Sequence, residues 1–211
     1  MEEAICAKSD NLKLQHQFEE LQQRASIDAL SGLLNRDTLE QCIKEQLEKM
    51  APEDTCALFI IDLDDFKQVN DTLGHQAGDQ AIHQSAQILS SLFRSTDIIG
   101  RLGGDEFAVF LWGRITEDLA RRKGTEICKT LQLVLGTYPV VNITASVGIY
   151  LADAGQQFDE MYQSADLALY KAKKAGKHGF CLKSHDSFQE ESGSNFLPVN
   201  TISLSGLLEC M

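Results

Sequence analysis

The sequence predicts an α+β domain in which helices flank a central, mainly antiparallel sheet. Residues 56–61 (CALFII) form a continuous apolar run, which is typical of a buried central strand. Segments with apolar residues on one helical face alternate with shorter strand-like runs along the chain. The 211 residues are enough for one core domain of about 150 residues with appendages.

We divide the chain into three parts. Residues 1–26 carry the seam of a coiled coil, formed by Ala7, Leu14, Phe18, Leu21 and Ala25. A seam of so few heptads is marginal alone, so this segment is either the stub of a longer signalling helix or an arm packed on its own domain. Residues 27–183 are the predicted domain. Residues 184–211 lack periodicity and are expected to form a flexible tail.

Helices and strands alternate regularly within the domain. After a glycine-containing loop at 28–36, the predicted elements are a helix around 39–47, a strand at 56–61, a helix at 77–93, strands at 97–102 and 107–111, a helix at 117–135, a strand at 140–151 and a helix at 158–175. Without the first and last helices the order is βαββαβ. This order is that of a ferredoxin-like or polymerase-palm sheet.

The strands at 97–102 and 107–111 flank the sequence GGDE. Gly103 and Gly104 can adopt the positive φ angles that a tight hairpin demands. The fold should therefore bring Asp105, at the hairpin tip, close to Asp62, which follows the central strand. Two carboxylates at one point form a site for magnesium, which prefers hard oxygen ligands and assists phosphoryl transfer. An aspartate after a strand is otherwise a turn or helix-cap residue.

Charge and composition narrow the classes of function. The net charge of −12 argues against general affinity for nucleic acid, which needs concentrated lysine and arginine. Six scattered cysteines without a CxxC pair indicate reduced thiols in a cytoplasmic protein. No run approaches the roughly 20 apolar residues of a membrane span. We expect no direct membrane insertion of this chain, although a longer parent protein could be membrane-attached.

Several motifs in consistent order resemble the signature series of the GGDEF family of diguanylate cyclases. The matching segments are DALSGLLNR (28–36), DLDDFKQVND (62–71), GH (74–75), GD (78–79), RLGGDEF (101–107) and the stretch from Ala165-Asp166 to Lys177. Ser31 stands where the family usually has threonine. The resemblance spans residues 26–181 and implies a nucleotide-cyclase-like version of the predicted fold.

The resemblance implies an activity: condensation of two GTP molecules into cyclic di-GMP with release of two pyrophosphates. It implies Mg²⁺ as the cofactor, with Mn²⁺ as an alternative. Each domain should hold one GTP, so a homodimer of facing domains is required for catalysis. Cyclic di-GMP is then both product and inhibitor.

The resemblance also implies site residues. Asp62, Asp105 and the Leu63 carbonyl would hold the metal, and Glu106 would either assist deprotonation of the ribose hydroxyl or hold a second metal. Asn70 and Asp79 would read guanine, unless Asp79 only caps the helix that follows. The phosphate-binding cations would be Lys67, Lys173 and Lys177, with Gly103 and Gly104 also lining the substrate site. Lys177 stands where arginine is common, so its contact is a point charge and not a bidentate grip.

Arg94 and Asp97 resemble the family's RxxD inhibitory product site. Outside this context an Arg and Asp three residues apart are a common helix-end salt pair. The family often offers a second arginine near the position of Glu126, which weakens the expected product binding.

Two rival functions remain open. The domain could be a nonenzymatic receptor for GTP or cyclic di-GMP that regulates a partner, although such receptors usually have a damaged hairpin motif. It could also make a different product, such as an adenine-containing cyclic dinucleotide or a mononucleotide. Asp79 is the residue that discriminates against the latter, because adenine presents an acceptor where guanine presents its ring N–H.

Overall fold

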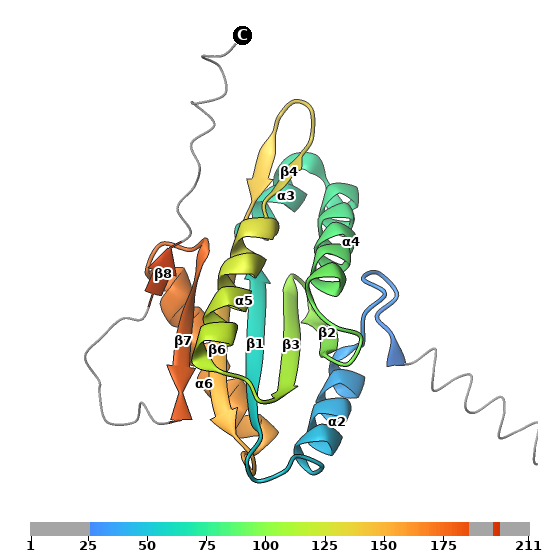
Figure 1. Cartoon of the computed structure of the whole chain (residues 1–211). Coiled ribbons are helices and arrows are strands. Elements are labelled where there is room, and N and C mark those ends of the chain that lie inside the picture. The colour runs from blue at the N-terminus through green and yellow to red at the C-terminus, as the bar shows by residue number, and fades with distance from the viewer. Residues whose placement is uncertain (1–25, 186–195, 199–211) are drawn as a thin grey trace, which may run out of the picture.

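A computed structural model describes residues 26–185 and 196–198 of the chain. Its main sheet has six strands in the order β2-β3-β1-β6-β7-β8 (Figure 1). These strands are β1 (Thr55–Leu63), β2 (Ile98–Gly103), β3 (Glu106–Gly113), β6 (Ala145–Asp153), β7 (Gly179–Ser184) and β8 (Phe196–Pro198). The helices are α2 (Arg36–Leu47), α3 (Phe66–Leu73), α4 (His75–Leu92), α5 (Glu117–Thr130) and α6 (Phe158–Lys174). A small second sheet pairs β4 (Leu133–Leu135) with β5 (Val141–Ile143).

The apolar run of β1 is explained by burial on both faces. Phe59 and Ile61 belong to the core beneath α4 and α5, whereas Leu58 and Ile60 belong to the core shared with α2 and α6. Figure 1 shows α5 in front of the sheet and α6 behind it. Successive strand residues point to opposite faces, so a strand covered on both sides must be apolar throughout.

The strand order confirms the predicted βαββαβ core. β1 lies between β3 and β6 and pairs with both in antiparallel register, and β2 pairs antiparallel with β3. Only the β6–β7 pair is parallel among the described strand pairs of the main sheet. The predicted fold class, a mainly antiparallel sheet flanked by helices, is therefore correct.

Two predicted boundaries were wrong. The helix expected to run to residue 135 ends at Thr130, because Leu133 and Leu135 are buried while Val134 is exposed, which is the two-residue alternation of a strand. The strand expected at 140–151 is divided at Thr144 into β5 and β6. The intervening β4–β5 hairpin belongs to a separate sheet and packs near α3 and α4.

The ends of the chain are described only in part. The predicted seam of residues 1–26 lies outside the described residues, apart from Ser26. Within the predicted tail, Ser184 completes β7, and Phe196–Pro198 pair antiparallel with residues 179–181 of that strand. No described helix is both long enough and apolar enough to cross a bilayer.

Candidate active site

The acid at the end of β1 is the centre of the site. Asp62 is only 7% exposed, and its Oδ2 lies 2.7 Å from the Lys173 ammonium of α6. Burial raises the pKa of Asp62 to about 6, Lys173 opposes the shift, and the charges of Asp105 and Glu106 add to it. Asp62 is therefore a buried acid with a cation held against it and with two further acids near enough to raise its pKa.

The β2–β3 hairpin carries Asp105 at its tip, beside the end of β1. Gly103 and Gly104 both have positive φ angles, +144° and +53°. Glu106 is directly opposite Asp62 in the β1–β3 register, and the Leu63 amide donates to the Asp105 carbonyl at 3.2 Å. The predicted metal ligands thus come from two adjacent strands whose register sets their separation.

Asp64 is a buried site residue for which the sequence predicted no role. It is 4% exposed and accepts hydrogen bonds from Thr144 Oγ1 at 2.6 Å, Ser146 Oγ at 2.7 Å and the His178 amide at 3.1 Å. These bonds tie the end of β1 to β6 and to the loop before β7. Its position two residues after Asp62 was visible in the sequence, but its hydrogen-bond partners were not.

The two predicted phosphate-binding lysines near the C-terminal end of α6 are both paired with acids. Besides Lys173 with Asp62, the Lys177 ammonium lies 2.6 Å from Asp65 Oδ1. This hydrogen bond raises the pKa of Lys177. Asp65 and Lys177 both adopt left-handed backbone conformations. The third predicted cation, Lys67, is exposed in the first turn of α3.

The predicted guanine readers lie on α3 and α4. Helix α3 was not predicted from the sequence, although Val69 is buried and Phe66 and Leu73 pack partly buried against the same core. A side chain on Gly78 would overlap Asn70 Oδ1, so the Asn70 amide lies against the backbone immediately before Asp79. Asp79 is exposed and lies inside α4, which begins at His75. It therefore does not cap that helix.

The predicted inhibitory pair lies at the other end of β2. Asp97 Oδ2 accepts the Arg94 backbone amide at 2.8 Å, so the carboxylate closes a turn and the pair is not a helix-end salt bridge. The Arg94 side chain is exposed. The nearby Lys123 ammonium lies 2.8 Å from Glu126 and 5.1 Å from the centroid of the Phe93 ring. Glu126 therefore neutralises a cation close to the predicted site.

Comparison with known families decides the classification. The model of the family described as "Diguanylate cyclase, GGDEF domain" matches residues 25–179. The chain belongs to the GGDEF family. Among curated relatives of this GGDEF domain, "Probable diguanylate cyclase DgcC" of Escherichia coli K12 is 39% identical over 170 residues, covering 79% of this chain and 45% of the relative. "Diguanylate cyclase DgcS" of Shewanella oneidensis is 31% identical, covering 79% and 55%.

The chain therefore spans about half the length of these curated relatives. One relative is named as a phosphodiesterase and not as a cyclase. "Cyclic di-GMP phosphodiesterase NbdA" of Pseudomonas aeruginosa is 33% identical, and the match covers only 22% of its length. Among solved structures, the coiled coil and GGDEF domain of DgcB from Caulobacter crescentus, in complex with c-di-GMP, matches with a TM-score of 0.72 and 26% identity, covering 84% of this chain and 95% of that one.

The donor set of the GGDEF domain fits a magnesium ion. Within residues 26–185 and 196–198, no group of three or more His, Cys, Asp and Glu side chains is arranged to hold a metal. Magnesium, however, is commonly bound through one or two carboxylates together with waters and substrate phosphates. Asp62 meets this requirement because it is a buried acid already facing a cation, the Lys173 ammonium.

Proposed function

We propose that this GGDEF domain is a diguanylate cyclase that condenses two GTP molecules into cyclic di-GMP with release of two pyrophosphates. The observation that carries the proposal is the position of Asp62, buried at the end of β1 and influenced by the charges of Asp105 at the hairpin tip and Glu106 on β3. Burial of this carboxylate has a desolvation cost that the contact with Lys173 offsets only in part, and a bound divalent cation would offset it further.

Asp62, Asp105 and the Leu63 carbonyl would hold Mg²⁺, with Mn²⁺ as an alternative. The bound ion would neutralise charge on the reacting phosphate oxygens. Glu106 would accept the proton of the attacking ribose hydroxyl or bind a second ion. Lys173 would exchange its contact with Asp62 for a substrate phosphate, and Lys177 would likewise leave Asp65, with Lys67 as a third cation.

Asn70 and Asp79 would select guanine. An ionised Asp79 accepts hydrogen bonds from the ring N–H and the amino group of guanine, and the Asn70 amide donates to its acceptors. The contact of Asn70 with Gly78 supports this assignment, because it brings the Asn70 amide against the residue that precedes Asp79. Gly103 and Gly104 would let the substrate approach the hairpin backbone, since neither glycine has a neighbouring atom within 4 Å of where its Cβ would be.

Catalysis would require two domains. One set of these residues suffices for one GTP, so ring closure requires a second domain presenting its own GTP. Specific activity should therefore rise with protein concentration until the dimer saturates. Replacement of Leu14 and Leu21 by Asp should lower activity at low concentration only, if the predicted seam supplies the pairing.

Product inhibition would use Arg94 and Asp97. The exposed Arg94 guanidinium can form a bidentate contact with a phosphate or a guanine edge. Occupation of this site by cyclic di-GMP would reduce synthesis, since the site immediately precedes β2, the strand that leads into the catalytic hairpin.

The deciding experiment is incubation of the purified protein with GTP and Mg²⁺, followed by identification of the product by mass. We expect cyclic di-GMP, no product from ATP, and no turnover after removal of divalent metal. Tight binding of GTP or cyclic di-GMP without any turnover would instead establish the receptor function. An adenine-containing product would overturn the assignment of Asp79.

A further inference from the structure

Asp65 begins helix α3 but does not cap it. It stands just before the first helical residue, Phe66, where an aspartate side chain normally accepts a hydrogen bond from a backbone amide of the first turn. The Asp65 backbone is instead left-handed, with φ 57°, and its carboxylate makes no such bond. Its Oδ1 lies 2.6 Å from the ammonium of Lys177, 112 positions away in the chain. The carboxylate therefore joins two distant segments and does not stabilise its own helix.

The ion pair connects two segments that carry predicted substrate contacts. Helix α3, which follows Asp65, carries the predicted guanine reader Asn70, whereas Lys177 lies in the loop between α6 and β7. The hydrogen bond with Asp65 raises the pKa of Lys177, and the charges of Asp64 and Asp62 add to the shift. The Lys177 ammonium is therefore close to the acids at the end of β1 while it contacts Asp65.

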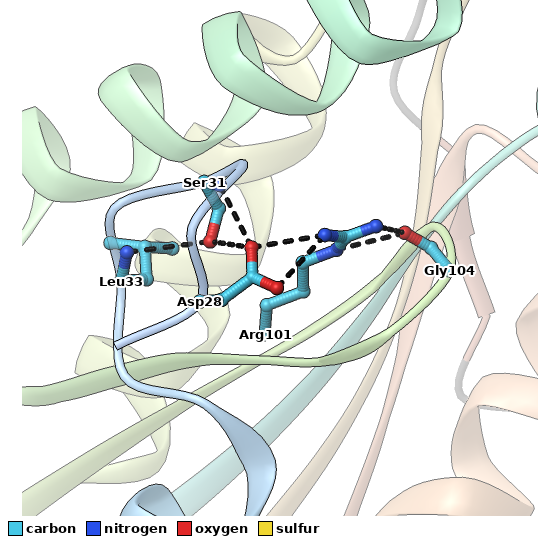
Figure 2. Close-up of polar contacts among 5 residues, drawn as sticks. All are labelled: Asp28, Ser31, Leu33, Arg101 and Gly104. Carbon is cyan, nitrogen blue, oxygen red and sulfur yellow. Dashed lines mark hydrogen bonds and ion pairs between the residues drawn. The ribbon is translucent and has the colours of Figure 1, made fainter. Parts of the chain in front are cut away.

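The exposure of this pair distinguishes it from an ion pair that is built into the domain. The Arg101 side chain, shown in Figure 2, is 12% exposed and donates to both carboxylate oxygens of Asp28 and to the Gly104 carbonyl. The side chains of Lys177 and Asp65 are 43% and 56% exposed, and the contact to Oδ1 joins them. An exposed pair of this kind contributes little to stability, so another anion can displace the carboxylate.

A phosphate of GTP would compete with the Asp65 carboxylate for the same ammonium, because both groups present anionic oxygens. An ammonium has three donors, but a carboxylate and a phosphate that shared it would repel each other. Binding of GTP to Lys177 therefore requires loss of the ion pair. That loss reduces the affinity that the same lysine would provide without Asp65.

We propose that Asp65 is a positioning residue that holds Lys177 away from the substrate phosphate and thereby lowers the affinity of the site for GTP. The proposal rests on the proposed function, which assigns Lys177 to a phosphate. Removal of the carboxylate should strengthen binding of substrate and transition state equally, so KM should fall while kcat stays nearly the same. Because the pair is exposed, we expect an effect of about two- to fivefold.

The test is calorimetry with a nonhydrolysable GTP analogue and Mg²⁺. Asp65→Asn removes the charge and keeps a residue that tolerates a left-handed backbone. Lys177→Gln removes the ammonium, and the double variant completes a mutant cycle. Glu117→Gln is the matched control, because it breaks an ion pair with Arg121 on α5 and changes the net charge by the same amount. Thermal melting identifies any variant that is not folded.

Asp65→Asn should lower the Kd of the analogue about two- to fivefold, whereas Glu117→Gln should leave it unchanged. Lys177→Gln should raise the Kd. Addition of Asp65→Asn to Lys177→Gln should have no further effect, because the group through which Asp65 acts is then absent. Initial rates with GTP should show the fall in KM for Asp65→Asn at nearly constant kcat.

Unchanged affinity in a folded Asp65→Asn protein would overturn the proposal. An equal gain in affinity in the Lys177→Gln background would overturn it as well, because Asp65 would then repel the substrate directly and not act through Lys177. If the unmodified protein binds the analogue but makes no cyclic di-GMP from GTP, the proposed function fails, and the binding comparison still decides the role of Asp65.

Discussion

The arginines near the two ends of β2 are used in opposite ways. Arg101 is mostly buried and forms four hydrogen bonds to Asp28 and Gly104. Arg94 is exposed, and among the described residues its guanidinium has no hydrogen bond or ion pair, while Asp97 is engaged with the Arg94 backbone. A guanidinium that is satisfied by the protein stabilises structure, whereas one left in solvent keeps its donors available to a ligand.

The acids near the two ends of β2 also differ in their surroundings. Asp62 and Asp105 are brought together at a cost, since burial and mutual repulsion raise the pKa of Asp62. Asp97 only closes a turn. We therefore expect changes at the hairpin end to affect the reaction itself, and changes at the Arg94 end to affect only its regulation.

Asp105→Asn should have the largest effect. Neutralising a metal ligand removes charge that stabilises the transition state, so turnover should fall at least about a hundredfold. Asp105 is partly exposed at the hairpin tip, so the thermal midpoint should stay within about 4 °C. Product formation followed by chromatography, together with a melting curve, measures both. Near-normal turnover would remove Asp105 from the mechanism.

Asp79→Ser should relax the choice of base. The unmodified protein should prefer GTP to ATP strongly, because a carboxylate facing adenine would meet an acceptor, and the substitution should reduce this preference about a hundredfold. Competition between the two nucleotides measures the ratio of kcat/KM values. Asp118→Ser, in the exposed first turn of α5, is the control and should leave the ratio unchanged. Equal use of both nucleotides by the unmodified protein would contradict the assignment.

Arg94→Ala tests the regulatory end of β2 directly. Binding of cyclic di-GMP at that site should weaken about 5- to 150-fold, and inhibition should weaken with it, whereas KM for GTP should not change. Calorimetry with cyclic di-GMP and initial rates at several product concentrations supply the measurements. Arg114→Ala, just after β3, is the exposed control. Absence of any product binding to the unmodified protein would eliminate the site.

Asp62→Asn should raise the free energy of unfolding at high pH, because burial of the ionised Asp62 carboxylate destabilises the folded protein. The folded-state pKa of Asp62, about 6, lies above its ordinary value of 3.8, so the folded form binds a proton more tightly than the unfolded chain. The stability that this group contributes is present below about pH 4 and is lost as pH rises through about 6. Asp62→Asn should thus match the unmodified protein at pH 4 and exceed its free energy of unfolding by about 1 to 3 kcal/mol at pH 8.

Urea denaturation at both pH values provides this comparison, with Asp153→Asn at the exposed end of β6 as the control. Added Mg²⁺ should stabilise the unmodified protein and reduce the difference. A variant that is less stable than the unmodified protein at pH 8 would show that the contact with Lys173 outweighs the cost of burial.

Local sequence patterns were sufficient for the elements that supply the acids. The continuous apolar run of β1 predicted a central strand ending near Asp62, and the paired glycines predicted the hairpin that carries Asp105. Both features depend on properties of neighbouring residues, burial in one case and backbone conformation in the other. The motif series also identified the family, which the match over residues 25–179 confirms.

Helix α3 and the strands β4 and β7 were not predicted in the same way. Helix α3 buries Val69 fully and Phe66 and Leu73 in part, and it packs against α4 and β5. β7 is paired in parallel with β6 across the whole of α6, and no local pattern encodes such a pairing. These elements depend on partners that the fold brings near.

By itself, the sequence determined which groups are available to the proposed chemistry: a carboxylate after a buried strand, a second at a glycine hairpin, and the lysines that we propose bind phosphate. Only the tertiary structure decided which of these charges are engaged. Lys173 is paired with Asp62, Asp64 is bound to Thr144 and Ser146, and Arg101 reaches Asp28 across 73 positions of the chain. Hydrogen bonds act over about 3 Å in space, and the sheet order, not the spacing along the chain, sets which groups come that close.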